Sequence, residues 1–244
     1  MSVHPGTLST GCLEDDLAAL FAPAVSVVVT DPSAEHDAPF NDENAAVARA
    51  NDKRRREFRA GRAAARQAMQ EMGLPAVAIP AGEDRAPVWP DDVTGSITHN
   101  DTLCIAVIAE RRNVPGIGVD IEEATPLDPD LFPEVCTLPE RAWLSLQSEE
   151  TRGLLAKLIF SAKECAYKCQ FPLSGTFLEF HDLEITADLE TGQFEATFTR
   201  PVPGFDRGAR LYGRYVVAQG QIITAITAEQ HPTLAAQRRR VSYW

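Results

Sequence analysis

Two acidic residues, Asp120 and Glu122, lie two positions apart in the strand-like run GIGVDIE (116–122). Because successive side chains of a strand point to opposite faces, we expect both carboxylates on one face and the apolar residues on the other. Gly118, on the acidic face, is expected to leave space for a ligand. Two like charges repel unless a cation lies between them, and oxygen ligands on a rigid element suit Mg²⁺. A strand that exposes its acidic face is the alternative, and this motif alone favours neither.

A third carboxylate comes from a helix-like run over 151–170. Its polar residues recur at steps of four, three and four, so they form one narrow stripe with apolar positions on both sides. Such a stripe indicates a helix that lines a cleft. Glu164 would then complete a three-carboxylate Mg²⁺ site, and Lys168 would neutralise a phosphate oxygen. The alternative is an exposed Glu164–Lys168 pair, which contributes about 0.3–0.5 kcal/mol to a helix. The stripe consists of Lys157, Ser161, Glu164 and Lys168.

Candidate anion contacts lie earlier in the chain. The run GSITHN (95–100) places His99 at a strand end, where a lone histidine is more often structural. Beside Thr98 and the arginine-rich stretch 53–66, it becomes a candidate phosphate contact. A basic cluster in an acidic protein indicates a site for a small anion. For the second cluster, Arg238–Arg240, a solvated helix face is the default interpretation.

The overall composition is that of an acidic globular protein. Of 244 residues, 44% are hydrophobic and 24% charged, and the net charge of −12 argues against general nucleic-acid binding. No apolar stretch approaches the ~20 residues of a membrane span, and the N-terminus does not resemble a signal peptide. We therefore expect a cytoplasmic protein without a membrane partner. Reduced, apolar thiols are the favoured interpretation of the cysteines at 12, 104, 136, 165 and 169.

The elements that must position these residues fall into two similar sets. The first comprises strand-like runs at 24–30, 93–99 and 103–110 and a helical segment over 42–72, in which Gly61 is a potential interruption. The second follows a Pro/Asp-rich stretch at 124–133. It comprises helices over 138–147 and 151–170, the latter closing before Pro172, and strands near 181–188, 193–200, 210–218 and 222–228.

This arrangement predicts an α+β fold of two pseudo-symmetric halves, a pseudo-dimer within one chain. Each half has an antiparallel sheet packed on a long helix, and the active site is expected in the cleft between them. The predicted halves are residues 1–114, with the candidate anion contacts, and 115–244, with the candidate metal site.

Four motifs span residues 54–168 in a specific order. Together they resemble the 4′-phosphopantetheinyl transferases of the surfactin and enterobactin synthetase-activating type, with actinobacterial members that serve polyketide, peptide or mycolate-type synthases as the nearest likeness. Phe160 stands where the family usually has Trp. The motifs are EFRAGRAAAR (57–66), SITH (96–99), GVDIE (118–122) and FSAKECAYK (160–168).

The resemblance implies Mg²⁺-dependent transfer of 4′-phosphopantetheine from coenzyme A, the co-substrate, to a serine of apo acyl or peptidyl carrier proteins, with release of 3′,5′-ADP. Mn²⁺ is a possible substitute for Mg²⁺, and a monomer is expected. Glu164, directly or through a metal-bound water, is the candidate base for the serine proton. Lys168 matches the lysine that touches the pyrophosphate and assists the leaving group. Asp120, Glu122 and Glu164 match the metal ligands.

The resemblance also makes residues 1–114 the coenzyme A-binding side and 115–244 the half with the catalytic helix, and it implies a set of coenzyme A contacts. Thr98 and His99 match contacts to its phosphates, and Arg54 and Arg62 match basic residues that grip them, the 3′-phosphate especially. Arg85 stands where many members have a lysine near the adenine; arginine is a bidentate donor where lysine is a point charge. Lys163 is expected to be structural or to contact ligand at the cleft edge.

Two other functions remain as alternatives. A non-catalytic module that binds coenzyme A or carrier proteins would not need three carboxylates beside a pyrophosphate. A different Mg²⁺-dependent nucleotide phosphotransferase would need a phosphate cradle, and the chain has neither GxxxxGK[ST] nor GxGxxG. Carrier docking is expected around 131–146 and 171–177, on an apolar or locally basic patch.

Overall fold

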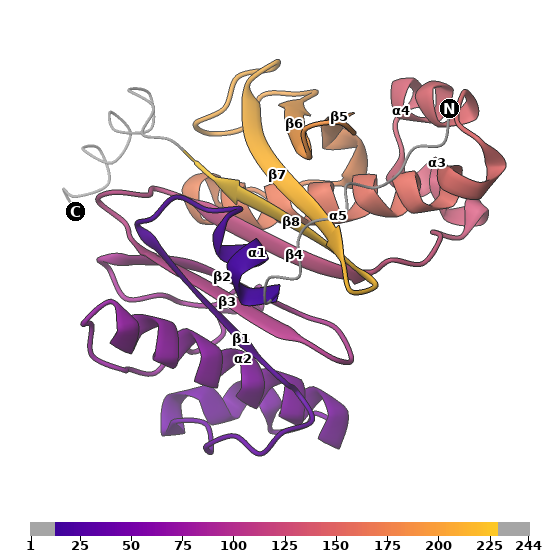
Figure 1. The fold of residues 1–244 in the computed structure, drawn as a ribbon. Helices are drawn as coiled ribbons and strands as arrows, with labels where there is room; N and C mark the ends of the chain where they lie inside the picture. The colour runs from indigo at the N-terminus through magenta and orange to yellow at the C-terminus, as the bar shows by residue number, and fades with distance from the viewer. Residues whose placement is uncertain (1–12, 229–244) are drawn as a thin grey trace.

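The computed structural model describes residues 13–228, in two antiparallel sheets that each pack against one long helix (Figure 1). Cys12 and the Arg238–Arg240 cluster lie outside the described residues. Among the residues described, no helix is both long and apolar enough to span a membrane. The predicted α+β class, with two sheets and two long helices, is confirmed.

The first sheet contains β1 (Val25–Thr30), β2 (Val93–His99) and β3 (Cys104–Glu110), in the order β1-β3-β2. All three coincide with the predicted strands to within a residue. The turn between β2 and β3 is held by the Asn100 side chain, whose Oδ1 accepts hydrogen bonds from the backbone N–H groups of Thr102 and Leu103 at 3.0 and 2.9 Å. An asparagine that bonds the backbone two residues on is typical of a tight turn, and it leaves His99 at the end of β2.

The long helix of this sheet, α2 (Asp52–Glu71), packs an alanine-rich face on β1 and β3. The predicted single helix over 42–72 is wrong at its start, because η1 (Asn41–Val47) is a separate 3₁₀ helix. Asn51 separates the two: its backbone is extended, and its side chain accepts a hydrogen bond from the Arg54 N–H, as an N-cap does. Gly61 does not interrupt α2.

The second sheet has the order β4-β8-β7-β6-β5, and in both sheets the first strand lies beside the last. In both, the long helix also comes after the first strand along the chain. The strands are β4 (Ile117–Glu123), β5 (Leu183–Asp188), β6 (Gln193–Phe198), β7 (Arg210–Ala218) and β8 (Gln221–Thr227). Between β4 and β5 lie η2 (Pro129–Leu131), α3 (Phe132–Val135), α4 (Leu138–Ser145), α5 (Glu149–Ser174) and η3 (Phe180–Asp182).

The helix α5 is longer than predicted. It passes through Pro172 and ends at Gly175, which adopts a left-handed φ of 63° and donates its N–H to the Phe171 carbonyl at 2.8 Å. Proline is costly in a helix interior because it lacks an N–H, but here it falls in the last turn, and Gly175 supplies the usual left-handed cap.

The two sheets share a hydrophobic core, and α2 and α5 lie on their far sides (Figure 1). Ile117, Val119 and Ile121 of β4 point into this core together with residues of β3, β8 and the short helix α1 (Leu13–Ala18). The alternation predicted for β4 is thereby confirmed, since Asp120 and Glu122 point away from this core toward α5.

The space beside Gly118 is filled by α5 and not by a ligand, so the expectation for this glycine is wrong. A Cβ atom at this position would lie 2.1 Å from the Cys165 carbonyl oxygen. Glycine therefore allows the backbones of β4 and α5 to approach closely, which brings the α5 side chains onto the acidic face of β4.

Replacing Gly118 with alanine tests this close approach. Because the obstacle is a backbone atom, Gly118→Ala is expected to lower the free energy of unfolding by about 2–3 kcal/mol, as overpacking does. Gly208→Ala is the control: its φ is 84° but its side-chain space is open, so the cost is about 1–2 kcal/mol from the backbone alone. Urea unfolding measures both, and a smaller loss at Gly118 than at Gly208 would contradict the packing.

Candidate functional site

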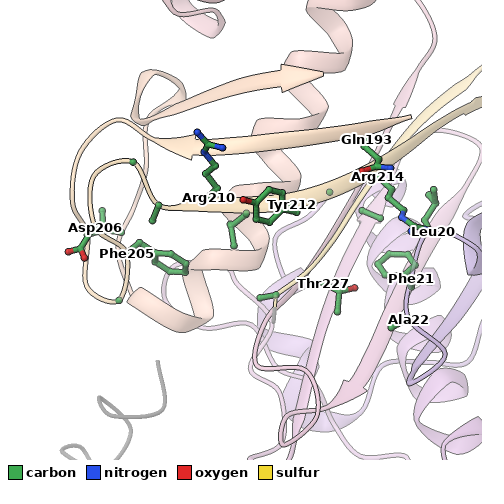
Figure 2. Close-up of a pocket in the computed structure, with 18 of the residues that line it drawn as sticks. Leu20, Phe21, Ala22, Gln193, Phe205, Asp206, Arg210, Tyr212, Arg214 and Thr227 are labelled. Carbon is green, nitrogen blue, oxygen red and sulfur yellow. The ribbon is translucent and has the colours of Figure 1, made fainter. Parts of the chain in front are cut away.

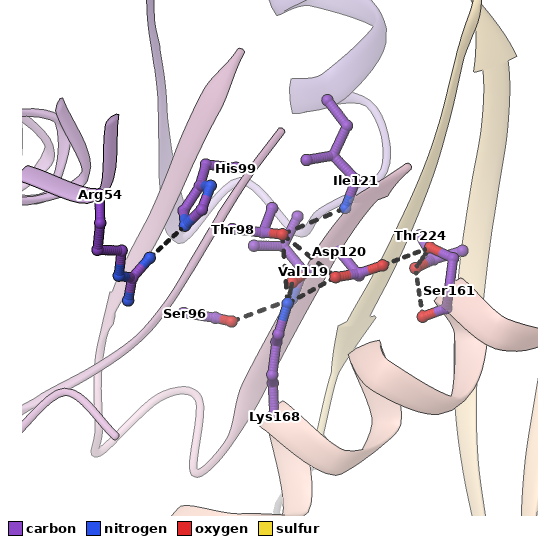
Figure 3. Close-up of polar contacts among 10 residues, drawn as sticks. All are labelled: Arg54, Ser96, Thr98, His99, Val119, Asp120, Ile121, Ser161, Lys168 and Thr224. Carbon is purple, nitrogen blue, oxygen red and sulfur yellow. Dashed lines mark hydrogen bonds and ion pairs between the residues drawn. The ribbon is translucent and has the colours of Figure 1, made fainter. Parts of the chain in front are cut away.

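The centre of the candidate site is the Asp120 carboxylate on β4, which is 4% exposed. Its Oδ1 accepts from the Lys168 ammonium at 2.6 Å and from the Thr98 hydroxyl at 3.2 Å. Its Oδ2 accepts from the Ser161 hydroxyl at 2.8 Å. Figure 3 shows these donors converging from β2 on one side and α5 on the other. Both sheet-and-helix units therefore contribute to holding one buried charge.

The edges of the two sheets meet at this carboxylate through side-chain hydroxyls. The Ser96 Oγ accepts from the Val119 N–H at 3.2 Å, and the Thr98 Oγ1 accepts from the Ile121 N–H at 3.3 Å (Figure 3). Lys168 also donates to the Thr98 Oγ1 at 3.2 Å. Two hydroxyls on alternate residues of β2 thus satisfy N–H groups of β4, which fixes the position of β2 relative to the metal-ligand candidates.

The other two carboxylates lie in the same electrostatic environment. Glu122 accepts a hydrogen bond from Lys157 at 3.2 Å, and burial together with the charge of Asp120 raises the pKa of Glu122. Burial also raises the pKa of Glu164; Lys168 opposes that rise, and Asp120 and Glu122 add to it. The three acids predicted from sequence therefore interact with one another across β4 and α5.

The donor set fits a hard divalent cation in chemistry. It consists of carboxylate oxygens. Burial first, and the charges of the neighbouring acids second, raise the pKa values of Glu122 and Glu164. Within residues 13–228, no three or more Asp, Glu, His or Cys side chains are already arranged so that they could hold a metal ion. The positive charge beside Asp120 and Glu122 comes from Lys168 and Lys157.

At the end of β2, the structure brings His99 and Arg54 together. The Arg54 guanidinium lies 2.7 Å from the His99 Nε2 (Figure 3), and Glu57 lies within 3.6 Å of Arg54 and 3.8 Å of His99. Burial lowers the pKa of His99, Glu57 opposes this, and the charges of Arg54 and Lys168 lower it further. A neutral imidazole that accepts from Arg54 agrees with that direction. The role of Glu57 was missed, although its i, i+3 spacing from Arg54 is a signal.

Arg62 lies on the same helix but points into the protein. It is 5% exposed, its Nε donates to the Ile79 carbonyl at 2.6 Å, and its guanidinium carbon lies 4.4 Å from the centre of the Phe58 ring. Burial lowers the pKa of Arg62 to about 10. These contacts give Arg62 a structural role, so its phosphate contact stays a prediction.

Arg85 is exposed in a tight turn. Its φ is 67°, and the turn is closed by hydrogen bonds of 2.9 Å from the Arg85 N–H to the Gly82 carbonyl and from the Gly82 N–H to the Ala86 carbonyl. Burial raises the pKa of Tyr167 on α5, and the charge of Asp84 raises it further. The charge of Asp84, the residue before Arg85, therefore reaches Tyr167 on α5.

Lys163 is structural, which is one of the two roles expected for it. Its Nζ donates to Glu140 at 2.8 Å and to the carbonyls of Val135 and Phe180 at 2.8 and 2.9 Å. Burial lowers the pKa of Lys163, and Glu140 opposes this. This buried pair ties the segment between β4 and α5 to the helix. Sequence analysis missed Glu140 as its partner.

A large surface hollow, of about 1310 Å³, lies apart from the acidic cluster. It is formed by β7, the loop before that strand and residues 20–23, and Arg210, Tyr212 and Arg214 line it (Figure 2). None of the candidate site residues contributes to its walls. The site is therefore identified by its converging charges and not by its depth.

Comparison with known proteins gives concordant matches over most of the chain. Residues 42–109 match the family model of the 4′-phosphopantetheinyl transferase N-terminal domain. Residues 116–219 match the family model of the 4′-phosphopantetheinyl transferase superfamily. The chain is 38% identical to the 4′-phosphopantetheinyl transferase Npt of Nocardia iowensis over 190 residues, 74% of this chain and 85% of that protein. It is 36% identical to Svp of Streptomyces mobaraensis over 77% of each chain, and 32% identical to PptT of Mycobacterium tuberculosis over 77% of this chain and 85% of that one.

Removing Lys163 tests the buried ion pair. Lys163→Met leaves the Glu140 carboxylate buried without its cation and is expected to lower the free energy of unfolding by about 3–5 kcal/mol. The matched control is Lys53→Met, because Lys53 pairs with Asp101 on the exposed surface, where an ion pair contributes little. Urea unfolding compares the two lysines, and equal losses would contradict the structural role of Lys163.

Proposed function

The chain belongs to the 4′-phosphopantetheinyl transferase superfamily, and we propose that the Asp120 cluster is where it acts. The chain is an enzyme that transfers 4′-phosphopantetheine to carrier proteins. In the proposed reaction, coenzyme A is the donor, a serine hydroxyl of an apo carrier protein is the acceptor and 3′,5′-ADP is the leaving group. The single observation that carries the assignment is the convergence of Thr98, Ser161 and Lys168 on one buried carboxylate.

The active site lies in a cleft between two pseudo-symmetric halves, residues 1–114 and 115–244. Two observations support this arrangement. Both sheets place their first strand beside their last, with the long helix after the first strand, and the two matching family segments end and begin at 109 and 116. The first half supplies Thr98 and His99, and the second supplies the acids and Lys168.

The phosphates of coenzyme A bind at the end of β2. Arg54 and Lys168 place positive charges there, beside the neutral His99, in a protein whose net charge is −12, so a local field favours an anion against the overall charge. Thr98 offers a hydroxyl beside them. Arg85 approaches from its turn near α5, and Arg62 contributes the guanidinium nitrogens that do not contact Ile79.

Asp120, Glu122 and Glu164 would hold Mg²⁺, or Mn²⁺ in its place, and the bound cation would supply Lewis-acid polarisation of the phosphates. Without the cation, Lys157 forms an ion pair with Glu122, and Lys168 forms one with Asp120. When coenzyme A binds, Lys168 turns from Asp120 to a phosphate oxygen of the leaving group and stabilises the charge that develops on it.

The serine oxygen attacks the phosphorus of the pantetheine phosphate, and the bond from that phosphorus to the bridging oxygen of 3′,5′-ADP breaks. The serine proton passes to the Glu164 carboxylate, directly or through a water.

The carrier protein docks as an acidic partner on apolar side chains, and the enzyme acts as a monomer without nucleic-acid or membrane partners. Leu138 and Leu146 at the two ends of α4 are 73% and 83% exposed, and Phe177 after α5 is 69% exposed. These side chains support docking around 131–146 and 171–177. Exposed apolar groups around a polar site are typical of a protein interface.

The defining experiment mixes the protein with Mg²⁺, coenzyme A and several apo carrier domains. Mass spectrometry is expected to show at least one carrier gaining phosphopantetheine, and chelation of the metal is expected to stop the gain. If no carrier gains mass with or without metal while coenzyme A still binds, the non-catalytic binding module is the better description.

The same assay tests the individual acids. Glu164→Gln is expected to lower the transfer rate at least about 100-fold, the lower end of general-base contributions. Asp120→Asn removes a proposed metal ligand and is expected to lower the rate at least as much. Circular dichroism is expected to be unchanged. Glu123→Gln is the matched control, because Glu123 follows Glu122 on β4 but is exposed. Wild-type turnover in either site variant would contradict the assignment.

A further inference from the structure

Two fully buried hydroxyls lie behind Asp120, on the side away from Lys168. Ser161 of α5 and Thr224 of β8 are both 0% exposed, and Thr224 is the register partner of Asp120 across β4 and β8. The two hydroxyl oxygens are 2.9 Å apart, and the Ser161 Oγ lies 2.8 Å from the Asp120 Oδ2 (Figure 3). The Thr224 Oγ1 also lies 3.1 Å from the Ser161 carbonyl oxygen.

The direction of this chain of hydroxyls is fixed by counting protons. An ionised carboxylate only accepts hydrogen bonds, and a serine hydroxyl has one proton to donate. Ser161 therefore donates its one hydrogen bond to Asp120 and must accept a hydrogen bond from Thr224. Thr224 can do so by sharing its one proton between the hydroxyl and carbonyl oxygens of Ser161, which lie 2.9 and 3.1 Å from its Oγ1. The chain runs from Thr224 to Ser161 to Asp120.

The same count applies to the carboxylate. A carboxylate has about four lone-pair sites. Thr98 and Lys168 engage Oδ1, and Ser161 engages Oδ2. One site on Oδ2 is left, and the position of Ser161 determines which one.

We propose that Ser161, itself held by Thr224, is a positioning residue that aims the free lone pair of the Asp120 Oδ2 at the bound divalent cation. This inference rests on the proposed function, in which Asp120 is a metal ligand. Ser161 and Thr224 are fully buried, so neither touches substrate. Their importance increases when Lys168 turns to the phosphates, because Ser161 and Thr98 are then the donors that remain on Asp120.

The test measures cation binding directly, with Mn²⁺ as the probe. Electron paramagnetic resonance titrates free Mn²⁺ in the presence of coenzyme A for the full chain. Ser161→Ala and Thr224→Val each remove one hydroxyl and are expected to weaken Mn²⁺ binding about tenfold, the lower end of the effect of outer-shell hydrogen bonds. Thr224→Ser keeps the hydroxyl and is expected to restore binding.

Thr227→Val is the matched control. It removes a hydroxyl from the same strand, β8, outside the chain of hydroxyls, and its Mn²⁺ affinity is expected to equal that of the wild type. Thermal melting of each variant shows whether a loss comes from unfolding. In the transfer assay, Ser161→Ala is expected to be rescued by raised Mg²⁺, unlike Asp120→Asn.

The outcomes separate the two claims. If the wild type binds Mn²⁺ and transfers phosphopantetheine while Thr224→Val and Ser161→Ala bind Mn²⁺ as tightly, the positioning role is wrong and the proposed function stands. Equal loss in Thr224→Val and Thr224→Ser also overturns the positioning role, because it would trace the loss to packing. If the wild type itself neither binds Mn²⁺ nor transfers, the proposed function fails.

Discussion

A buried carboxylate must be compensated, and the compensation of Asp120 organises the rest of the molecule. Removing an ionised acid from water without partners costs several kcal/mol. Asp120 obtains its three partners from two separate elements: Thr98 on β2, and Ser161 and Lys168 on α5. The edge contact between β2 and β4 and the close approach of α5 at Gly118 are the structural conditions for this arrangement.

The same interaction explains why a helix packed on both flanks carries a polar stripe. A simple row of ion pairs along the helix surface would join Glu164 to Lys168. The Lys168 ammonium instead forms an ion pair with Asp120 on the strand β4. Lysine here supplies the positive charge that a divalent cation would otherwise supply. In the proposed function, a divalent cation takes the place of these lysine charges at the acidic cluster when coenzyme A binds.

Local chemistry predicted much of this structure. The alternation of GIGVDIE predicted the facing of Asp120 and Glu122, and the stripe on α5 predicted Ser161 and Lys168 on one line. The sequence could not predict contacts between residues that are distant along the chain. Ser161 and Thr224 are 63 positions apart, and Lys163 and Glu140 are 23 apart. The prediction of ligand space beside Gly118 was wrong for the same reason, because the backbone of Cys165, 47 positions later, occupies that space. The helix errors came from Asn51 and Pro172, whose effect depends on whether the backbone around them is extended or already helical.

In the proposed function, Lys168 holds Asp120 only until a cation and coenzyme A replace it. A crystal structure of the protein with coenzyme A and Mn²⁺ tests this most directly, because anomalous scattering locates manganese independently of the model. We expect one manganese ion bound to Asp120, Glu122 and Glu164, with the Lys168 ammonium moved from Asp120 to a phosphate oxygen. Coenzyme A bound with no manganese at these acids, and with Lys168 still on Asp120, would contradict it.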